Sequence, residues 1–402
     1  MTTAIPEIPE TYRALQIPSP SLPPRVTTLP TPPLVPGSVL VAPLITNLVS
    51  YISTIFPHNT RGYTYPTPLV PGAAAVGRVL ASAPDLPGFK PGQLVFLDPV
   101  LRAHDGSGVK VLHALNGGNT ETGRAMMEGP WRNGSFGEVV RVPGENVHLL
   151  NKGRLLGPKL GYGVEDLGYL ASLMVAYGGL RDIDVRPGEL VLVAPATGSF
   201  GGAAVHVALA LGADVIAMGR NMAVLEELEG VAGRTYPDGQ LRTVRMTGSV
   251  EGDMAALAAA AKEMGSARGE VDAYFDISPP NAGASPHIKA GVMSLRQYGR
   301  VSLMGGAAGD VGFPYFTIMR KGLTLKGTFM YTPEQIDEVI KLVETGKLKL
   351  GREKAGAECV GVYGLEEWEE AFRVAGEEGR MGRFALLAPN EKEALRTGKG
   401  AL

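Results

Sequence analysis

The segment from Val191 to Asn221 places the strictest limit on how this chain can fold. An apolar, β-branched stretch (190–193) is followed by a turn rich in small residues (196–202), an apolar helix-forming run and a second apolar stretch (214–218). The sequence therefore predicts the order strand, turn, helix, strand. This order is the opening unit of a doubly wound parallel sheet.

The turn in this segment has the composition of a phosphate-binding loop. Gly198 and Gly201 stand where the second and third glycines of a G-x-G-x-x-G pattern fall, and Ala196 takes the first place. Such a turn lets the backbone approach a pyrophosphate, and the next helix presents its free N–H groups to the anion. Small residues also permit ordinary helix–strand packing, so the motif gains its weight from its place between strand and helix. We predict that it binds a dinucleotide.

The end of the second strand indicates which dinucleotide. An acidic residue there would bind the ribose 2′-hydroxyl of NAD, whereas an arginine accommodates a 2′-phosphate. The chain has Gly219, Arg220 and Asn221 and no acid. Gly219 leaves room, Arg220 supplies a fork of donors suited to phosphate, and Asn221 can add a hydrogen bond. We therefore predict NADP(H); the alternative is that Arg220 is simply an exposed residue of a β–α loop.

Length and composition indicate a globular enzyme with two domains. The chain has 402 residues, of which 45% are hydrophobic and 19% charged, and its net charge is −2. We expect a small-molecule substrate, since nothing in this charge points to a nucleic acid or a membrane surface. Cys359 is the single cysteine, which excludes an intramolecular disulfide and a cysteine-based structural zinc site. The N-terminal residues lack the apolar core of a secretory signal, so we expect a cytoplasmic location.

The rest of the chain divides into two kinds of pattern. Short β-like runs separated by Gly and Pro fill roughly the first 150 residues, and strands alternate with helices from the central segment to Gly327. We predict a Rossmann domain over 173–327 and a β-rich domain over 1–172 and 328–402. The polar tail EKEALRTGKGAL is expected to fray.

A long Gly/Asn-rich insertion lies within the β-rich domain, between Leu101 and Gly134. Loops of this length without regular structure are usually functional or mobile. His104, His113 and Trp131 in it either reach a substrate or decorate the surface.

Six short motifs follow one another in an order that resembles the medium-chain dehydrogenase/reductase superfamily over nearly the whole chain. They are Pro71–Gly77, Lys90–Phe96, Gly134–Val140, Val185–Val193, Gly299–Gly305 and Lys321–Gly327. The resemblance implies an α/β fold, in which a doubly wound, parallel-sheet Rossmann domain accompanies a GroES-like β-rich catalytic domain. It also implies a homodimer, formed through the Rossmann edge strand near Arg300 to Met304.

The chain departs from the zinc-dependent members of that superfamily. By pattern, the positions of their catalytic zinc ligands are Asn47, Ala73 with Ala74, and about Ala171. None of these side chains can hold zinc. The chain therefore resembles the zinc-free branch, similar to quinone oxidoreductases and enoyl reductases. Without a Lewis acid, such a site suits substrates that are already electrophilic, with a hydrogen-bond donor for the charge that develops on oxygen.

The segment from Asn47 to Tyr51 resembles the N-P-x-D-Y segment of that branch, with Leu48 and Ser50 in place of Pro and Asp. The resemblance places Asn47 near the vacated metal position and makes Tyr51 the candidate donor to the substrate oxygen. The alternative is that Tyr51 is an amphipathic wall residue.

Further cofactor contacts are implied by the same resemblance. They are Thr197, Ser199 and Phe200 at the pyrophosphate, Ser278 at the ribose, Met304, Gly305 and Gly306 at the carboxamide through backbone groups, Tyr177 near the nicotinamide, and Arg383 at the phosphates. Packing alone explains Tyr177 nearly as well.

The prediction is thus a zinc-independent, NADPH-dependent oxidoreductase that acts on an enone, enoyl or quinone substrate. Two alternatives remain open at this point. One is a specialised biosynthetic reductase for an imine or a carrier-bound intermediate. The other is a nucleotide-binding protein without redox turnover, because fold does not fix function.

Overall fold

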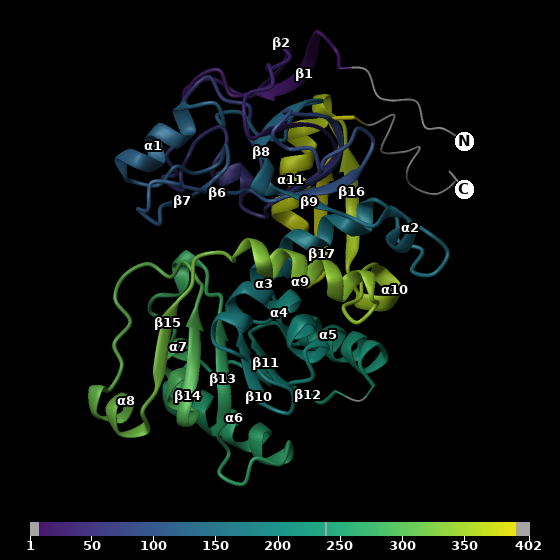
Figure 1. Cartoon of the computed structure of the whole chain (residues 1–402). Coiled ribbons are helices and arrows are strands. Elements are labelled where there is room, and N and C mark those ends of the chain that lie inside the picture. Colours follow the sequence, from purple (N-terminus) through teal and green to yellow (C-terminus); the bar gives the residue numbers. More distant parts are fainter. Residues whose placement is uncertain (1–7, 238, 391–402) are drawn as a thin grey trace. The chain divides into compact units, whose positions relative to one another are not determined.

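The computed structural model describes residues 8–237 and 239–390, and the chain divides into two compact units (Figure 1). Unit 1 consists of Met1–Ala171, Glu358–Gly379 and Arg383–Leu402, and unit 2 consists of Ser172–Ala357 and Arg380–Gly382. The polar C-terminal tail lies outside the described residues.

Unit 2 is built on one six-stranded sheet in which every neighbouring pair is parallel. The strands, in spatial order, are β12 (Leu241–Arg245), β11 (Asp214–Gly219), β10 (Leu190–Ala194), β13 (Val271–Asp276), β14 (Leu295–Leu303) and β15 (Thr324–Gly327). Strands β10 and β11 are nearly continuous apolar runs, which is typical of parallel strands covered on both faces.

The helices of unit 2 are α4 (Ser199–Ala210), α5 (Met222–Thr235), α6 (Val250–Glu263), α7 (Pro286–Met293), α8 (Tyr315–Lys321), α9 (Pro333–Glu344) and α10 (Arg352–Ala355), preceded by α3 (Leu170–Asp182). Helices α4 to α8 each connect two successive strands, and α9 and α10 follow the last strand. The predicted strand, turn, helix and strand are thus β10, the turn, α4 and β11. The apolar pattern over 288–297 does not form one element, since α7 ends at Met293 and β14 begins at Leu295.

Unit 1 is built on a seven-stranded, mostly antiparallel sheet. Its path is β16 (Glu358–Tyr363), β17 (Arg383–Leu387), β3 (Ser38–Leu48), β4 (Ala75–Ser82), β5 (Leu94–Leu97) and β9 (Val147–Leu149), and β8 (Val140–Pro143) also pairs with β3. A separate hairpin joins β1 (Thr11–Gln16) and β2 (Arg25–Pro30). The unit also contains α2 (Lys152–Leu155) and α11 (Trp368–Glu378).

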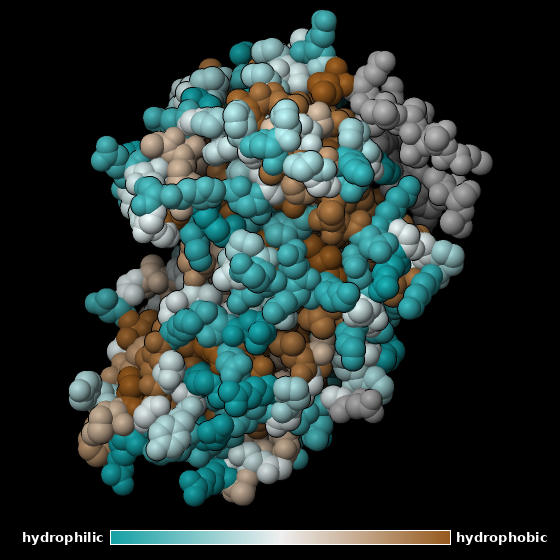
Figure 2. Space-filling model, in the orientation of Figure 1, coloured by the Kyte–Doolittle hydropathy of each residue, from teal (hydrophilic) through white to brown (hydrophobic). Residues whose placement is uncertain are grey.

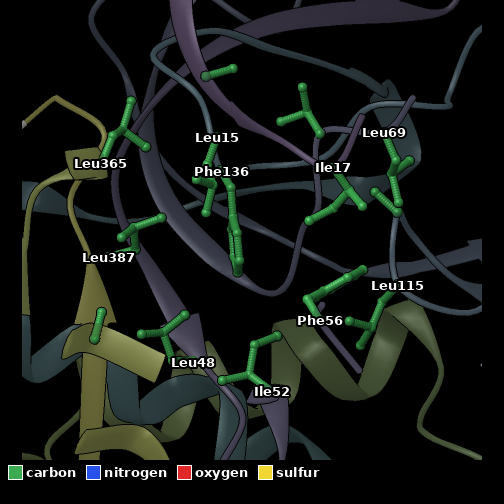
Figure 3. Packing of buried hydrophobic residues seen from close by; sticks show 14 of the residues in the cluster. Leu15, Ile17, Leu48, Ile52, Phe56, Leu69, Leu115, Phe136, Leu365 and Leu387 are labelled. Atoms are coloured by element: carbon green, nitrogen blue, oxygen red, sulfur yellow. The ribbon is translucent and has the colours of Figure 1, made fainter. Parts of the chain in front are cut away.

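The main core of unit 1 explains why the C-terminal segment returns to it. Leu15, Leu48 and Phe136 pack in one buried cluster with Leu365 and Leu387 (Figure 3). Without the last two residues and their neighbours on α11 and β17, one face of β3 would lose its apolar partners. The C-terminal return is therefore a requirement of the core.

The insertion at 101–134 has regular structure, contrary to the expectation of an irregular loop. It contains β6 (Val100–Arg102) paired with β7 (Lys110–Leu112), and then α1 (Glu121–Glu128). Leu101, Val111 and Met127 form a small buried core of their own. These apolar positions lie too far apart in sequence to show a periodic pattern.

The main segment of unit 2 ends at Ala357, whereas the sequence pattern predicted an end at Gly327. The additional residues are tied to this unit, because Thr235 on α5 donates its hydroxyl to Lys354 O at 2.7 Å and Tyr177 on α3 bonds to Glu338 on α9.

The edge strands of the parallel sheet are β12 and β15, so the expected edge near Arg300 to Met304 is wrong. Strand β14 is paired on both sides, with β13 and with β15. Large exposed apolar side chains gather around the β15 edge: Tyr298, Tyr315, Phe316, Met319 and Phe329. Figure 2 shows brown and tan atoms over this part of unit 2, at the lower left. In the described part of the chain, no helix is both long enough and apolar enough to cross a membrane.

Candidate nucleotide site and substrate pocket

The turn between β10 and α4 is shaped by two glycines with different surroundings. A Cβ added at Gly201 would lie 2.0 Å from Pro195 O, so only glycine allows the helix to approach the turn this closely. A Cβ added at Gly198 would meet nothing within 4 Å. The N–H of Ala196 donates to Met218 O at 2.8 Å and fixes the turn to β11. The backbone at Gly198 is therefore open to a ligand.

The first turn of α4 offers uncapped donors at this opening. Gly198 is the N-cap residue and supplies no side chain to the helix. The N–H groups that follow, at Ser199 and Phe200, have no acceptor within the helix. Thr197 and Ser199 are half-buried beside them. The predicted pyrophosphate residues thus lie together at a helix N-terminus, which is an anion-binding arrangement.

The returning C-terminal segment reaches this turn at Arg380. Gly198 and Arg380 form an isolated antiparallel bridge, and Met381 N donates to Thr197 O at 3.1 Å. Arg380 is exposed, and its guanidinium lies 3.7 Å from the carboxylate of Glu227. A cation that the sequence pattern did not single out therefore stands beside the turn.

Arg383, the predicted phosphate contact, is engaged elsewhere. It begins β17, and its guanidinium lies 3.4 Å from the carboxylate of Glu358 and 2.9 Å from that of Glu378. Its contact with the cofactor phosphates stays a prediction. Arg380 is the residue of the returning segment that lies beside the turn between β10 and α4.

The end of β11 has the features expected for a 2′-phosphate. A Cβ added at Gly219 would lie 2.6 Å from the side-chain methyl carbon of Thr197, so glycine keeps this position free of a clash. Arg220 is exposed, and Arg245 at the end of β12 lies in register with Gly219. Neither guanidinium forms a hydrogen bond or an ion pair with another residue that the structure describes. Arg245 is a second cation here; only the pairing of β12 with β11 reveals it.

Asn221 has a structural task in addition to its predicted one. Its side-chain oxygen accepts the N–H of Val224 at 3.4 Å and caps α5. The amide NH₂ remains as a donor.

Ser278 is turned inward and not toward solvent. It is 1% exposed, and its hydroxyl donates to Asp276 at 2.5 Å and lies 2.9 Å from Nε2 of His287. The other ring nitrogen of His287 lies 2.6 Å from the hydroxyl of Ser285. Burial lowers the pKa of His287 to about 4 and raises that of Asp276. The hydroxyl predicted to meet the ribose is therefore part of a buried network.

The segment from Met304 to Gly306 is held by its N–H groups. Met304 N donates to Asp276 O at 3.0 Å, and Gly306 N donates to Ser278 O at 2.9 Å. A Cβ on Gly305 would lie 2.5 Å from Ser278 N, so the two loops meet closely. The carbonyl groups of this segment are the backbone groups left to accept from a carboxamide, as the prediction requires.

Tyr177 is explained by packing and one strong hydrogen bond. It is 4% exposed, and its hydroxyl donates to Glu338 at 2.6 Å. Arg181 lies 3.3 Å from the same carboxylate. Burial and the bond to Glu338 raise the pKa of Tyr177. Its contact with a nicotinamide stays a prediction.

In unit 1, the positions matched to zinc ligands meet at one small pocket. Asn47, Ala74 and Ala171 all line it, with Ile45, Ala75, Val76, Phe96, Leu167 and Gly168. Its free volume is about 10 Å³, roughly the space of one water molecule. Zinc needs thiolate, imidazole or carboxylate ligands, and this lining offers none. Within the described residues, no group of three or more His, Cys, Asp or Glu side chains could hold a metal ion.

Asn47 carries the one polar side chain of this lining. Its backbone N–H donates to Ala74 O at 2.9 Å, and Leu386 of β17 lies opposite it in the sheet. The half-buried carboxamide forms no hydrogen bond with the described residues, so its donors are available to a ligand.

Tyr51 is half-buried and packs against the main core of unit 1. The guanidinium carbon of Arg61 lies 3.7 Å from the centre of its ring, and Tyr63 meets it edge-on at 6.4 Å. Burial, reinforced by Tyr63 and opposed by Arg61, raises the pKa of Tyr51. The hydroxyl is therefore protonated at neutral pH. The packing supports the wall interpretation, and the donor role stays a prediction.

The aromatic residues of the insertion serve its own structure. His113 is 5% exposed and bonds to the backbone of Trp131 and Asn133; burial lowers its pKa to about 4. Trp131 packs against the small core of the insertion. His104 is exposed, 3.0 Å from the carboxylate of Glu145. Of these three residues, His104 is the one that lies on the surface.

Two family models match consecutive parts of the chain. Residues 46–152 match the alcohol dehydrogenase GroES-like domain, and residues 200–345 match the zinc-binding dehydrogenase model. Together they cover more than half of the chain. The fold class predicted from the sequence, a Rossmann domain with a GroES-like domain, is confirmed.

Known proteins give more distant similarities. An alcohol dehydrogenase of Rhizobium meliloti (strain 1021) is 27% identical over 184 residues, which are 44% of this chain and 46% of that protein. The chain thus matches about half the length of this curated relative.

Solved structures match over nearly the whole chain but at low identity. A cobalt- and zinc-bound thermostable alcohol dehydrogenase from Pyrobaculum aerophilum superposes with a TM-score of 0.68 at 19% identity, over 94% of this chain and 100% of that one. The crotonyl-CoA carboxylase/reductase AntE, in complex with NADP, gives 0.71 at 16% identity, over 96% and 97%. Identities this low show the fold alone. With the two family matches and the geometry above, they establish that the chain is a member of the medium-chain dehydrogenase/reductase superfamily of oxidoreductases.

Proposed function

We propose that this protein is a zinc-independent, NADPH-dependent reductase of an activated C=C bond, in an enone or enoyl substrate, or of a quinone. The observation that carries the proposal is the pocket where Asn47, Ala74 and Ala171 meet. In a zinc-dependent member, ligands would converge there, but this lining has one carboxamide and otherwise apolar groups. An alcohol or simple carbonyl would find no Lewis acid to polarise its oxygen.

The choice of NADPH rests on the charges at the end of β11. Arg220 and Arg245 are exposed cations without partners among the described residues, and no acid follows Gly219. A carboxylate there would bind the ribose hydroxyl of NAD and repel a phosphate, whereas an arginine binds the phosphate. The NADP complex of a crotonyl-CoA carboxylase/reductase with this fold is consistent with the assignment.

The chemistry divides between the cofactor and the protein. Bound NADPH supplies a hydride to an electrophilic carbon. The negative charge that develops on the conjugated oxygen needs donors, and Asn47 and Tyr51 are the proposed ones. The pKa of Tyr51 is raised by burial, so its hydroxyl is protonated at neutral pH and would donate a hydrogen bond to that oxygen. Net addition of hydride and a proton saturates the C=C bond.

The test is the oxidation of NADPH, followed at 340 nm, with a panel of enones, enoyl thioesters, quinones and aldehydes. The proposal predicts turnover of conjugated acceptors and little turnover of saturated aldehydes. A carrier-bound thioester that is reduced far faster than its free counterpart would favour the specialised biosynthetic alternative. Binding of NADPH without turnover of any acceptor would overturn the proposal.

We also propose that two copies associate through the edge around β15. An unpaired edge strand pairs readily with another strand, and a twofold axis lets the same edge serve both copies. The exposed Tyr315, Phe316 and Met319 on α8 beside it would be covered by this association.

A further inference from the structure

Arg61 lies in a turn of unit 1 that is firmly braced. The side-chain oxygen of Asn59 accepts the N–H of Tyr63 at 2.9 Å, and its NH₂ donates to Tyr63 O at 2.7 Å. Asn59 has a φ of 43°, a left-handed conformation that asparagine tolerates better than most residues. Arg61 N donates to Thr54 O at 3.1 Å. The backbone of the turn is therefore fixed before any ligand binds.

The guanidinium of Arg61 is fixed as well. It stacks on the ring of Tyr51 at 3.7 Å, and its Nε donates to the hydroxyl of Tyr63 at 3.2 Å. These two contacts hold the plane of the guanidinium and leave its two terminal nitrogens unused. A stacked and oriented fork loses little entropy when it binds a planar anion.

The guanidinium of Arg61 has no carboxylate partner among the described residues. It is half-buried, yet it forms no ion pair with any carboxylate of the described chain. Arg13 lies 2.8 Å from Glu366 and Arg102 lies 2.6 Å from Asp98, whereas the half-buried Arg132 and Arg141 donate through their terminal nitrogens to backbone carbonyls. The terminal nitrogens of Arg61 have neither kind of acceptor among the described residues. A partly desolvated charge normally has a partner, so the missing partner of Arg61 points to a ligand.

We propose that Arg61 binds a carboxylate of the substrate through its two terminal nitrogens. The inference rests on the proposed function and names its substrate class: a short α,β-unsaturated carbonyl compound that also carries a carboxylate. The substrate is short because Arg61 touches Tyr51, the proposed donor to the reacting carbonyl group. The hydroxyl of Tyr63, which accepts from Arg61, has its own proton to give to the same carboxylate.

A purely structural Arg61 would act differently. If the guanidinium only supports the ring of Tyr51, its removal changes the turnover of charged and neutral substrates in the same proportion. If it binds a carboxylate, removal changes the ratio between them. The measurement must therefore be a ratio of two matched substrates.

The experiment compares the enone 4-oxopent-2-enoate with its methyl ester, which lacks the charge and is also the more electrophilic acceptor, so the readout is the change in the acid-to-ester ratio of kcat/KM. We expect Arg61→Gln to lower this ratio about 10- to 100-fold, as for the loss of one charge-assisted pair. Arg61→Lys should recover part of the ratio. Arg268→Gln removes an exposed arginine of unit 2 and is the matched control. An unchanged ratio in Arg61→Gln would overturn the inference and leave the proposed function standing.

If neither compound is reduced, the carboxylate site is decided by binding, and the proposed function by the full panel of acceptors. Calorimetric titration of the NADP⁺-saturated protein then gives Kd for the acid and the ester. A Kd that rises about tenfold or more in Arg61→Gln for the acid alone supports the site. Equal Kd values in wild type and variant refute it.

Discussion

Asn47, at the end of β3, and Ala171, in the first turn of α3, line the same pocket although most of unit 1 separates them in sequence. Ala74 lines the pocket as well. The positions that the family pattern matches to the zinc ligands at Asn47, Ala74 and Ala171 therefore share one lining. These side chains cannot bind zinc, and the proposed reaction is therefore one that needs no metal.

The end of β11 gives the first prediction. Arg220→Ala should raise Kd for NADPH about 10- to 100-fold, as for the loss of a charge-assisted bond to phosphate, and should change Kd for NADH little. Arg245→Ala should act in the same direction but more weakly, since it stands on the neighbouring strand. Fluorescence titration measures both, with Arg268→Ala as control. Equal weakening of NADPH and NADH would remove the 2′-phosphate role.

Alanine substitutions at the two glycines of the phosphate turn should have different effects, one on stability and the other on NADPH binding. In Gly201→Ala the new Cβ meets Pro195 O at 2.0 Å, so the variant should lose roughly 1–3 kcal/mol of unfolding free energy. Gly198→Ala meets no protein atom within 4 Å, so its thermal midpoint should stay close to wild type. Its methyl group instead stands where the dinucleotide backbone would approach, and NADPH should bind more weakly. Calorimetry and nucleotide titration separate the two; a destabilised Gly198→Ala would contradict the open turn.

Buried His206 on α4 predicts a pH dependence of stability. It is 1% exposed, neither ring nitrogen has a hydrogen-bond partner, and burial lowers its pKa to about 4. Its stabilising contribution is complete above the unfolded pKa of about 6.5 and is lost as pH falls toward 4, at about 1.4 kcal/mol per pH unit.

Urea denaturation of wild type and His206→Leu between pH 7 and 4.5 measures this contribution. The variant should lose stability less steeply with falling pH than the wild type does. His113, whose pKa is also lowered, should keep part of the slope in both proteins. Parallel curves for the two proteins would show that His206 does not titrate as its burial requires.

The apolar surface on α8 predicts the oligomeric state. Phe316, 65% exposed, should be covered in the proposed dimer, so Phe316→Asp should shift the sedimenting species toward a monomer. Leu22→Asp, at a position that is 50% exposed in unit 1, should not. A wild-type monomer at micromolar concentration, or a dimer that survives Phe316→Asp, would exclude this edge as the interface.

The parts of the fold that were predicted are those in which the pattern is local. β10, the glycine turn and α4 follow one another without a break. The apolar run of the strand, the small residues of the turn and the apolar run of the helix are each recognisable locally. The order of the elements and the two-domain division follow for the same reason.

The parts that were missed depend on pairing between distant segments. Arg245 comes to the nucleotide site only because β12 lies beside β11, and Arg380 only because the returning chain bridges to Gly198. The ion pairs of Arg383 with Glu358 and Glu378, and the hydrogen bonds of the Ser278 hydroxyl to Asp276 and His287, likewise cannot be read from the local pattern. Long-range register, not propensity, decided these residues.

The central claim, that conjugated acceptors are reduced without a metal, is tested most directly by measuring enone-dependent NADPH oxidation before and after exhaustive dialysis against a zinc chelator. The account predicts the same kcat/KM in both samples and no gain when zinc is added back. Activity that disappears with the chelator and returns with zinc would contradict it.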